Sequence, residues 1–161
     1  MKKLTIALAF LTALSLPVSA QDFNKGLAAH NDGNYAAAIE EWKPLAEAGD
    51  VKSQYKLGIM YENGQGVIQE NSEAIKWYRA AADQGDVEAQ YKLGFMYRSG
   101  NSVNRDNKIA HMWYNIASAN GSEKSIKSRD GTAVLMTAAA IEKAQAMARE
   151  CMNSGYEKCG Y

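Results

Sequence analysis

Four residues near the middle of the chain match a motif that nucleophilic enzymes use. Ser53 and Lys56, in the string Ser53-Gln54-Tyr55-Lys56, have the S-x-x-K spacing of the nucleophile motif of penicillin-interacting enzymes. Those enzymes also carry S-D-N and K-T-G, and neither string occurs here. A nucleophile needs a base and an oxyanion site as well. We therefore predict no catalytic residue and a protein that is not an enzyme.

The two histidines are the residues that could hold a metal ion. His30 and His111 are far apart in the sequence, and no H-x-x-x-H string or acidic cluster accompanies them. His111 takes the position that Ile75 holds in a repeat described below, so a partly buried, hydrogen-bonded histidine is expected there. We predict no metal and no cofactor.

The two cysteines of the chain lie in its last eleven residues. An even pair predicts a disulfide if the protein is exported, which the first twenty residues described next lead us to expect. The C-x7-C spacing of Cys151 and Cys159, with no histidine nearby, argues against a zinc site. It is also not the C-x-x-C of a thiol oxidoreductase. We predict that a Cys151–Cys159 disulfide closes the tail, residues 151–161.

Residues 1–20 have the layout of a secretory signal peptide. Lys2 and Lys3 form a basic start, an apolar run from Leu4 to Leu16 follows, and the segment closes on Val18-Ser19-Ala20. The run is too short for a transmembrane helix, which needs about 20 apolar residues. We expect cleavage near Ala20, a periplasmic or secreted protein, and no stable membrane insertion.

The charges of the chain give no support to nucleic-acid binding. The full chain has 18 basic and 18 acidic residues, and loss of Lys2 and Lys3 leaves 16 against 18. Nucleic-acid binding proteins normally present a basic patch to the phosphates. We expect a protein or peptide partner, no nucleic acid, and a monomer.

A stretch of the sequence is repeated with a period of 36 residues. The string Ser53-QYKLGIMYENG recurs as Ala89-QYKLGFMYRSG, so Ser53 of the nucleophile-like string corresponds to an alanine. Matching positions include Tyr55 and Tyr91, Leu57 and Leu93, Gly58 and Gly94, Tyr78 and Tyr114, and Gly85 and Gly121. A period of this length is typical of stacked repeats. Gly58 lacks a side chain, which leaves room for Trp77 and Tyr78 on a neighbouring helix.

Each copy predicts two helices. Residues 71–85 place Ala74, Tyr78 and Ala81 along one apolar stripe, the pattern of a helix that buries one face. Residues 51–64 place Val51, Leu57 and Tyr61 at a similar helical spacing, which predicts the first helix of the copy. The glycines of Gly64-Gln-Gly66-Val67 suit the turn between the two helices.

The motifs of these copies are similar to those of the Sel-one-like repeat family. They are A/S-Q-Y-K-L-G-x-M-Y, then G-x-G-V, then A-I-K-W-Y-R-A-A-A-D-Q-G, and Ser102 replaces the second glycine in the later copy. The resemblance covers Val51 to Gly121 and implies a tetratricopeptide-like solenoid. Some cysteine-rich relatives have been discussed as β-lactamases, so a cell-wall or β-lactam hydrolase is the alternative function.

We expect one all-α domain over residues 21–161. It is predicted as a right-handed α/α solenoid of antiparallel helix pairs, about eight helices and no strand. The units are residues 22–50, of tetratricopeptide type, then 51–86 and 87–121, a degenerate capping helix pair at 122–152, and the tail.

The resemblance also implies a binding surface. In tetratricopeptide-like arrays the first helix of each pair lines a concave groove that holds peptides or partner helices. By that analogy the partner-binding residues are Lys52, Tyr55, Ile59, Glu62, Asn63, Glu88, Tyr91, Phe95, Arg98 and Ser99. Aromatic residues among charges suit a binding patch. Packing between adjacent repeats is the other interpretation of Tyr55, Ile59, Tyr91 and Phe95, and the sequence leaves both open. The expected function is a non-enzymatic protein–protein interaction module.

Overall fold

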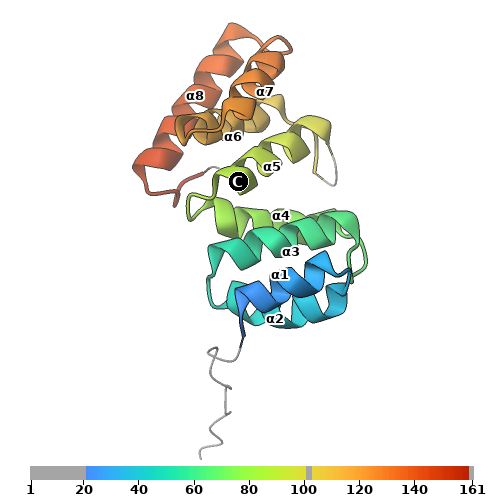
Figure 1. The fold of residues 1–161 in the computed structure, drawn as a ribbon. Helices are drawn as coiled ribbons and strands as arrows, with labels where there is room; N and C mark the ends of the chain where they lie inside the picture. The colour runs from blue at the N-terminus through green and yellow to red at the C-terminus, as the bar shows by residue number, and fades with distance from the viewer. Residues whose placement is uncertain (1–20, 101–102, 160–161) are drawn as a thin grey trace, which may run out of the picture.

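The computed structural model describes residues 21–100 and 103–159, and its regular elements in those ranges are all helices (Figure 1). They are α1 (Phe23–Asn31), α2 (Tyr35–Glu47), α3 (Val51–Asn63), α4 (Asn71–Ala82), α5 (Val87–Ser99), α6 (Asn107–Ala119), α7 (Glu123–Ala133) and α8 (Ala138–Asn153). The predicted all-α solenoid with eight helices is confirmed for this part of the chain. None of these helices is long and apolar enough to cross a membrane. The predicted signal peptide, residues 1–20, and Ser102 lie outside the described residues.

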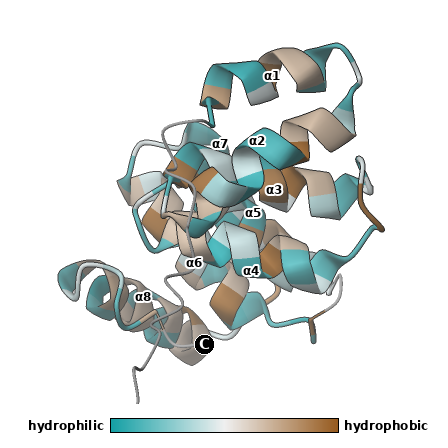
Figure 2. Cartoon of the chain, turned by 90° about the horizontal axis from the view of Figure 1, so that it is seen from below, coloured by the Kyte–Doolittle hydropathy of each residue, from teal (hydrophilic) through white to brown (hydrophobic). Residues whose placement is uncertain are grey.

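The helices stack in pairs along one direction. α1 packs on α2, α3 on α4 and α5 on α6, and the second helix of each pair also packs on the first helix of the next. Figure 1 shows this stack rising from α1 and α2 at one end to α7 and α8 at the other. The helices carry hydrophobic and hydrophilic residues side by side (Figure 2), as elements with one buried face do.

The two sequence copies fold with the same local structure at each helix end. Asp50 accepts a hydrogen bond from the Ser53 amide at 2.8 Å, and Asp86 accepts one from the Ala89 amide at 2.7 Å, so each caps its helix. The copies also end α3 and α5 alike, because Gly64 and Gly100 adopt the left-handed conformation that glycine enters without strain.

A glycine in each first helix lies directly against an aromatic ring of the second helix. A Cβ added to Gly58 would lie 2.5 Å from the ring of Tyr78, and one added to Gly94 would lie 2.6 Å from the ring of Tyr114. Both tyrosines are fully buried. The predicted role of Gly58 is confirmed for Tyr78. The first pair uses the same contact, because a Cβ on Gly26 would lie 2.4 Å from Trp42.

Two buried glutamines connect successive pairs at equivalent positions. Gln54 donates to the carbonyl of Ala46 at 3.0 Å and accepts from Gln84 at 2.8 Å. Thirty-six residues later, Gln90 donates to the carbonyl of Ala82 at 3.2 Å and accepts from Asn120 at 2.9 Å. Each glutamine therefore gives a hydrogen-bond partner to a carbonyl at the end of the preceding helix, and so joins that helix to the pair that contains the glutamine.

Replacing Gln90 by leucine is expected to lower the free energy of unfolding by about 1 kcal/mol. The variant loses two hydrogen bonds worth about 1 kcal/mol each, and the added apolar burial offsets part of that loss. Chemical denaturation followed by circular dichroism measures the change. Exposed Gln145→Leu on α8 is the control and should leave stability within about 0.5 kcal/mol. A Gln90 variant as stable as the control would contradict this role.

The C-terminal end of the stack is arranged differently from the first three pairs. α7 and α8 each pack mainly against α6 rather than against each other, although a fourth antiparallel pair was expected. α7 is polar, with Ser125 and Thr132 as its buried residues. It therefore offers little apolar surface to α8, whose Ala144 and Ala148 are buried in the core that includes α6.

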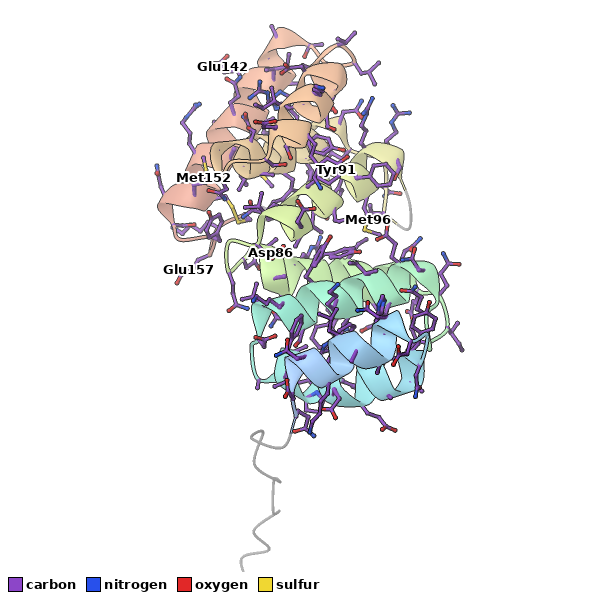
Figure 3. The ribbon with its side chains drawn as sticks, in the orientation of Figure 1. Asp86, Tyr91, Met96, Glu142, Met152 and Glu157 are labelled. Carbon is purple, nitrogen blue, oxygen red and sulfur yellow. A yellow bond between two sulfur atoms is a disulfide. The ribbon has the colours of Figure 1, made fainter. Side chains whose placement is uncertain are left out.

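A disulfide joins Cys151 and Cys159, whose Cα atoms are 4.4 Å apart. Both cysteines are buried in the larger core cluster. The closed segment turns back toward the preceding pairs, because Tyr156 Oη accepts a hydrogen bond from Asn120 at 2.8 Å. Figure 3 shows Met152 and Glu157 beside the stack, near the height of Asp86. The tail therefore covers the end of the core beside α8.

Candidate functional site

The nucleophile-like string does not form an accessible catalytic site. Ser53 has 0 % exposure, and its Oγ has no hydrogen-bond partner among the described residues. The ammonium group of Lys56 lies 5.9 Å from the centre of the Trp42 ring. Because Ala89 is equally buried at the same repeat position, Ser53 is a packing residue.

Replacing Ser53 by alanine is expected to leave the free energy of unfolding unchanged within about 0.5 kcal/mol, or to raise it. A buried hydroxyl without a partner is unfavourable by about 1 kcal/mol or more, and alanine removes it. The reverse change, Ala89→Ser, should lower stability by about 1 kcal/mol. Thermal unfolding measures both variants. Loss of a β-lactam-hydrolysing activity in Ser53→Ala would contradict this packing role.

The histidines are packing residues as well. His111 is 2 % exposed, and burial together with the nearby Arg129 lowers its pKa. A hydrogen-bonded histidine was expected, but its Nδ1 has no hydrogen-bond partner among the described residues. His30 packs against the rings of Tyr35 and Trp42, with centroids 5.3 and 5.6 Å away. In the described ranges no three His, Cys, Asp or Glu side chains gather as a metal site would require.

The predicted partner-binding residues lie on α3 and α5, within one surface that runs along the stack. We call this surface the first-helix face: the exposed and half-buried side chains of α1, α3, α5 and α7, together with Arg105 in the turn after α5. Contacts between these helices make it continuous. Lys52 lies over the Phe23 ring at 5.9 Å, and Lys124 pairs with Glu88 and lies 4.2 Å from the centre of the Tyr91 ring. Figure 3 labels Tyr91 on α5.

Tyr55 and Tyr91 pack partly within their own repeats. The Tyr55 ring lies 5.8 Å from that of Tyr78, and the Tyr91 ring lies 5.7 Å from that of Tyr114. Burial, with a smaller contribution from Glu88, raises the pKa of Tyr55 to about 12. Both side chains are half-buried, so packing accounts for one part of each ring and the remainder is exposed on the first-helix face.

Glu62 is occupied by contacts within the protein. It accepts hydrogen bonds from Tyr78 Oη and from Lys92 Nζ at 2.8 Å. Only 18 % of its side chain is exposed. Burial first, and then the bond to Glu62, raise the pKa of Tyr78. The Glu62–Lys92 pair therefore connects neighbouring repeats.

A hollow of about 250 Å³ lies at the end of α5. Three predicted site residues, Phe95, Arg98 and Ser99, line it together with Arg105. Phe95 is 43 % exposed, which is unusual for a phenylalanine. Ser99 donates to the carbonyls of Phe95 and Met96, so the hollow presents one aromatic ring and two guanidinium groups. Asn63 takes the position of Ser99 on α3 and is exposed.

Sequence reasoning missed three residues of this face: Phe23, Arg105 and Lys124. Lys124 stands 36 residues after Glu88 and 72 after Lys52, so extending the repeat period through α7 would have found it. Phe23 belongs to the shorter first unit, and Arg105 follows the turn after α5. Phe23 stands 32 residues before Tyr55, as Gly26 stands before Gly58, and Arg105 stands 36 residues after Gln69, so the aromatic position was detectable but the cation at 105 was not.

Larger hollows lie at the C-terminal end. One, of about 650 Å³, is lined by Asp83 and Glu150 with residues 155–159 of the tail. Another, of about 450 Å³, lies between α6, α7 and α8. None of the predicted partner-binding residues lines either hollow.

The structural repeats coincide with a known sequence family. The Sel1 repeat model matches residues 51–86 and 87–122, which are the α3–α4 and α5–α6 units. No curated protein sequence matches the chain.

Two solved structures are similar to this one. A protective antigen present in uropathogenic Escherichia coli strains, which displays an SLR fold, is 27% identical with a TM-score of 0.78, over 86% of this chain and 31% of the antigen. The chain thus spans about a third of the antigen's length. A Sel1 repeat protein from Oxalobacter formigenes is 29% identical over 67% of this chain and 97% of its own, with a TM-score of 0.49. The family match and the stacked helix pairs together show that the chain carries two Sel1 repeats, over residues 51–122.

Proposed function

We propose that this chain is a non-enzymatic, monomeric protein–protein interaction module, and that its first-helix face is a concave surface that captures a segment of the partner. Sel1 repeat proteins are generally protein-interaction modules. The exposed ring of Phe95 beside its hollow carries the proposal, because an exposed aromatic residue among charged groups is typical of a binding anchor.

The same contacts that build the stack prepare this face for binding. The glycine–tyrosine contacts fix each first helix against its second helix, and the buried glutamines fix one pair against the next. A face ordered before binding loses little conformational entropy when a partner arrives. An extended or helical segment is the ligand that such surfaces accept.

An exported location is part of the proposal. The signal-like pattern of residues 1–20 and the Cys151–Cys159 disulfide both support a periplasmic or secreted protein, because disulfides persist in oxidising compartments. The alternative, a cell-wall or β-lactam hydrolase, gains no support from the burial of Ser53.

The test compares two exposed apolar residues. Phe95→Ala is expected to weaken partner capture about tenfold, because loss of an aromatic anchor removes about 1 to 2 kcal/mol or more of binding free energy. The control is Ile68→Ala, since Ile68 is 89% exposed but lies in the turn between α3 and α4. Each variant is immobilised, and the proteins it retains from the exported fraction of the producing cell are quantified by mass spectrometry.

Thermal unfolding of both variants separates binding from stability. If Phe95→Ala retains the same partners at the same level as the unmodified protein, the proposed site is wrong. If Ile68→Ala loses them instead, the partner binds beside the turn rather than on the first-helix face.

A further inference from the structure

The acidic residues of α3 and α5 are already paired within the protein. These two helices contain two acids, Glu62 and Glu88. Glu62 pairs with Lys92, and Glu88 pairs with Lys124 of α7. The Glu62 carboxylate is largely buried, and the charge of the exposed Glu88 carboxylate is balanced by Lys124, so neither adds net negative charge to this surface.

The remaining charges of this part of the first-helix face are cationic. α3 and α5 contain four basic residues against the two acids. Lys92 is used by Glu62, whereas Lys52, Lys56 and Arg98 have no ion pair among the described residues. The full chain has equal numbers of basic and acidic residues, so this surplus is a property of the face and not of the composition.

The hollow at the end of α5 adds a specific geometry to this surplus. Arg98 and Arg105 line it beside the exposed ring of Phe95, and Arg105 has no ion pair in the described ranges either. Guanidinium groups bind carboxylates through paired, charge-assisted hydrogen bonds. The hollow therefore suits a carboxylate that has an apolar neighbour.

We infer that the partner segment is acidic, with one carboxylate between Arg98 and Arg105 and an apolar side chain against Phe95. This inference rests on the proposed function, because it names the chemistry of the segment that the first-helix face captures. Ion pairs join α3 to α5 and α5 to α7, so a segment of about six residues, extended over about 20 Å, is expected to cross these helices.

Selection of peptides from a random library displayed on phage tests the inference. Peptides of about twelve residues exceed the expected span, and they are selected on the oxidised protein. Selected peptides are then titrated against two double variants. Lys52→Glu/Arg105→Glu reverses two exposed cations of the face, and Lys43→Glu/Lys143→Glu reverses two exposed lysines on α2 and α8 with the same change in net charge.

Enrichment of Asp and Glu beside a large apolar residue is the expected result. Binding of those peptides should weaken about tenfold or more in Lys52→Glu/Arg105→Glu, remain unchanged in the control, and weaken at high salt. Peptides that depend on the face but are neutral or basic would overturn the acidic partner and leave the proposed function intact. Peptides that bind both double variants equally well, or no selected peptide at all, would overturn both.

Discussion

Gly94→Ala is expected to lower the free energy of unfolding by about 2 kcal/mol. The new methyl group would lie 2.6 Å from the ring of Tyr114, which is fully buried and cannot move without disturbing the core. Overpacking of this kind costs about 3 kcal/mol at the upper end of its usual range. The higher helix propensity of alanine offsets about 1 kcal/mol. The melting temperature should fall by about 6 °C.

Gly131→Ala is the matched control for this substitution. Gly131 also lies inside a helix, but a methyl group added there would have Arg98 Nη2, 3.9 Å away, as its nearest neighbour beyond the helix backbone. Alanine should therefore stabilise the protein by about 0.5 to 1 kcal/mol there. Gly58→Ala should behave like Gly94→Ala because its methyl group would meet Tyr78. A Gly94 variant that is no less stable than the Gly131 variant would show that the helices do not approach at the repeat glycine.

Removal of the disulfide should destabilise the C-terminal end by about 2.6 kcal/mol. Cys151→Ala/Cys159→Ala opens a loop of about nine residues, and the entropy that its closure removes from the unfolded chain corresponds to this value. Both cysteines are buried, and alanine avoids placing a new polar group in the core. Urea denaturation gives the free energy, and hydrogen exchange over residues 151–159 reports the tail directly.

Reduction of the unmodified protein provides the control for the disulfide. A thiol reductant should lower its stability to about that of the double variant and leave the variant unchanged. Equal stability of the oxidised protein and the double variant would mean that the disulfide does not stabilise the fold.

The repeat explains which parts of the fold were predictable. Leu57 and Leu93 are both buried at equivalent positions, and Gly58 and Gly94 make equivalent contacts. This equivalence follows from the sequence, because residues 36 positions apart occupy the same place in successive helix pairs. The packing of α8 was not predictable in this way. Its alanines have no period partner, and although the polarity of residues 123–133 is visible in the sequence, only the tertiary structure reveals that α8 packs on α6 as a result.

The position of the candidate site on the first helices was predictable from the sequence, but the pairing of its charged residues was not. The first-helix positions follow from the spacing of the repeat, and Phe95 and Arg98 lie on one hollow as expected of neighbouring site residues. Glu62 was expected to face a partner, whereas it bonds to Tyr78 and Lys92. The contact with Lys92 joins different repeats, and a helix pattern contains no information about which charges meet across repeats.

Site-specific photo-crosslinking tests the binding face most directly. A photoreactive amino acid is placed at Ile59 or Phe95 on the first-helix face, and at Lys43 of α2 or Lys143 of α8 away from it, in the cell that makes the protein. We expect the two first-helix positions to crosslink to one and the same partner and the other two to give no product with it. Crosslinks to that partner from Lys43 or Lys143 alone would place binding on the opposite side of the stack and contradict the proposed function.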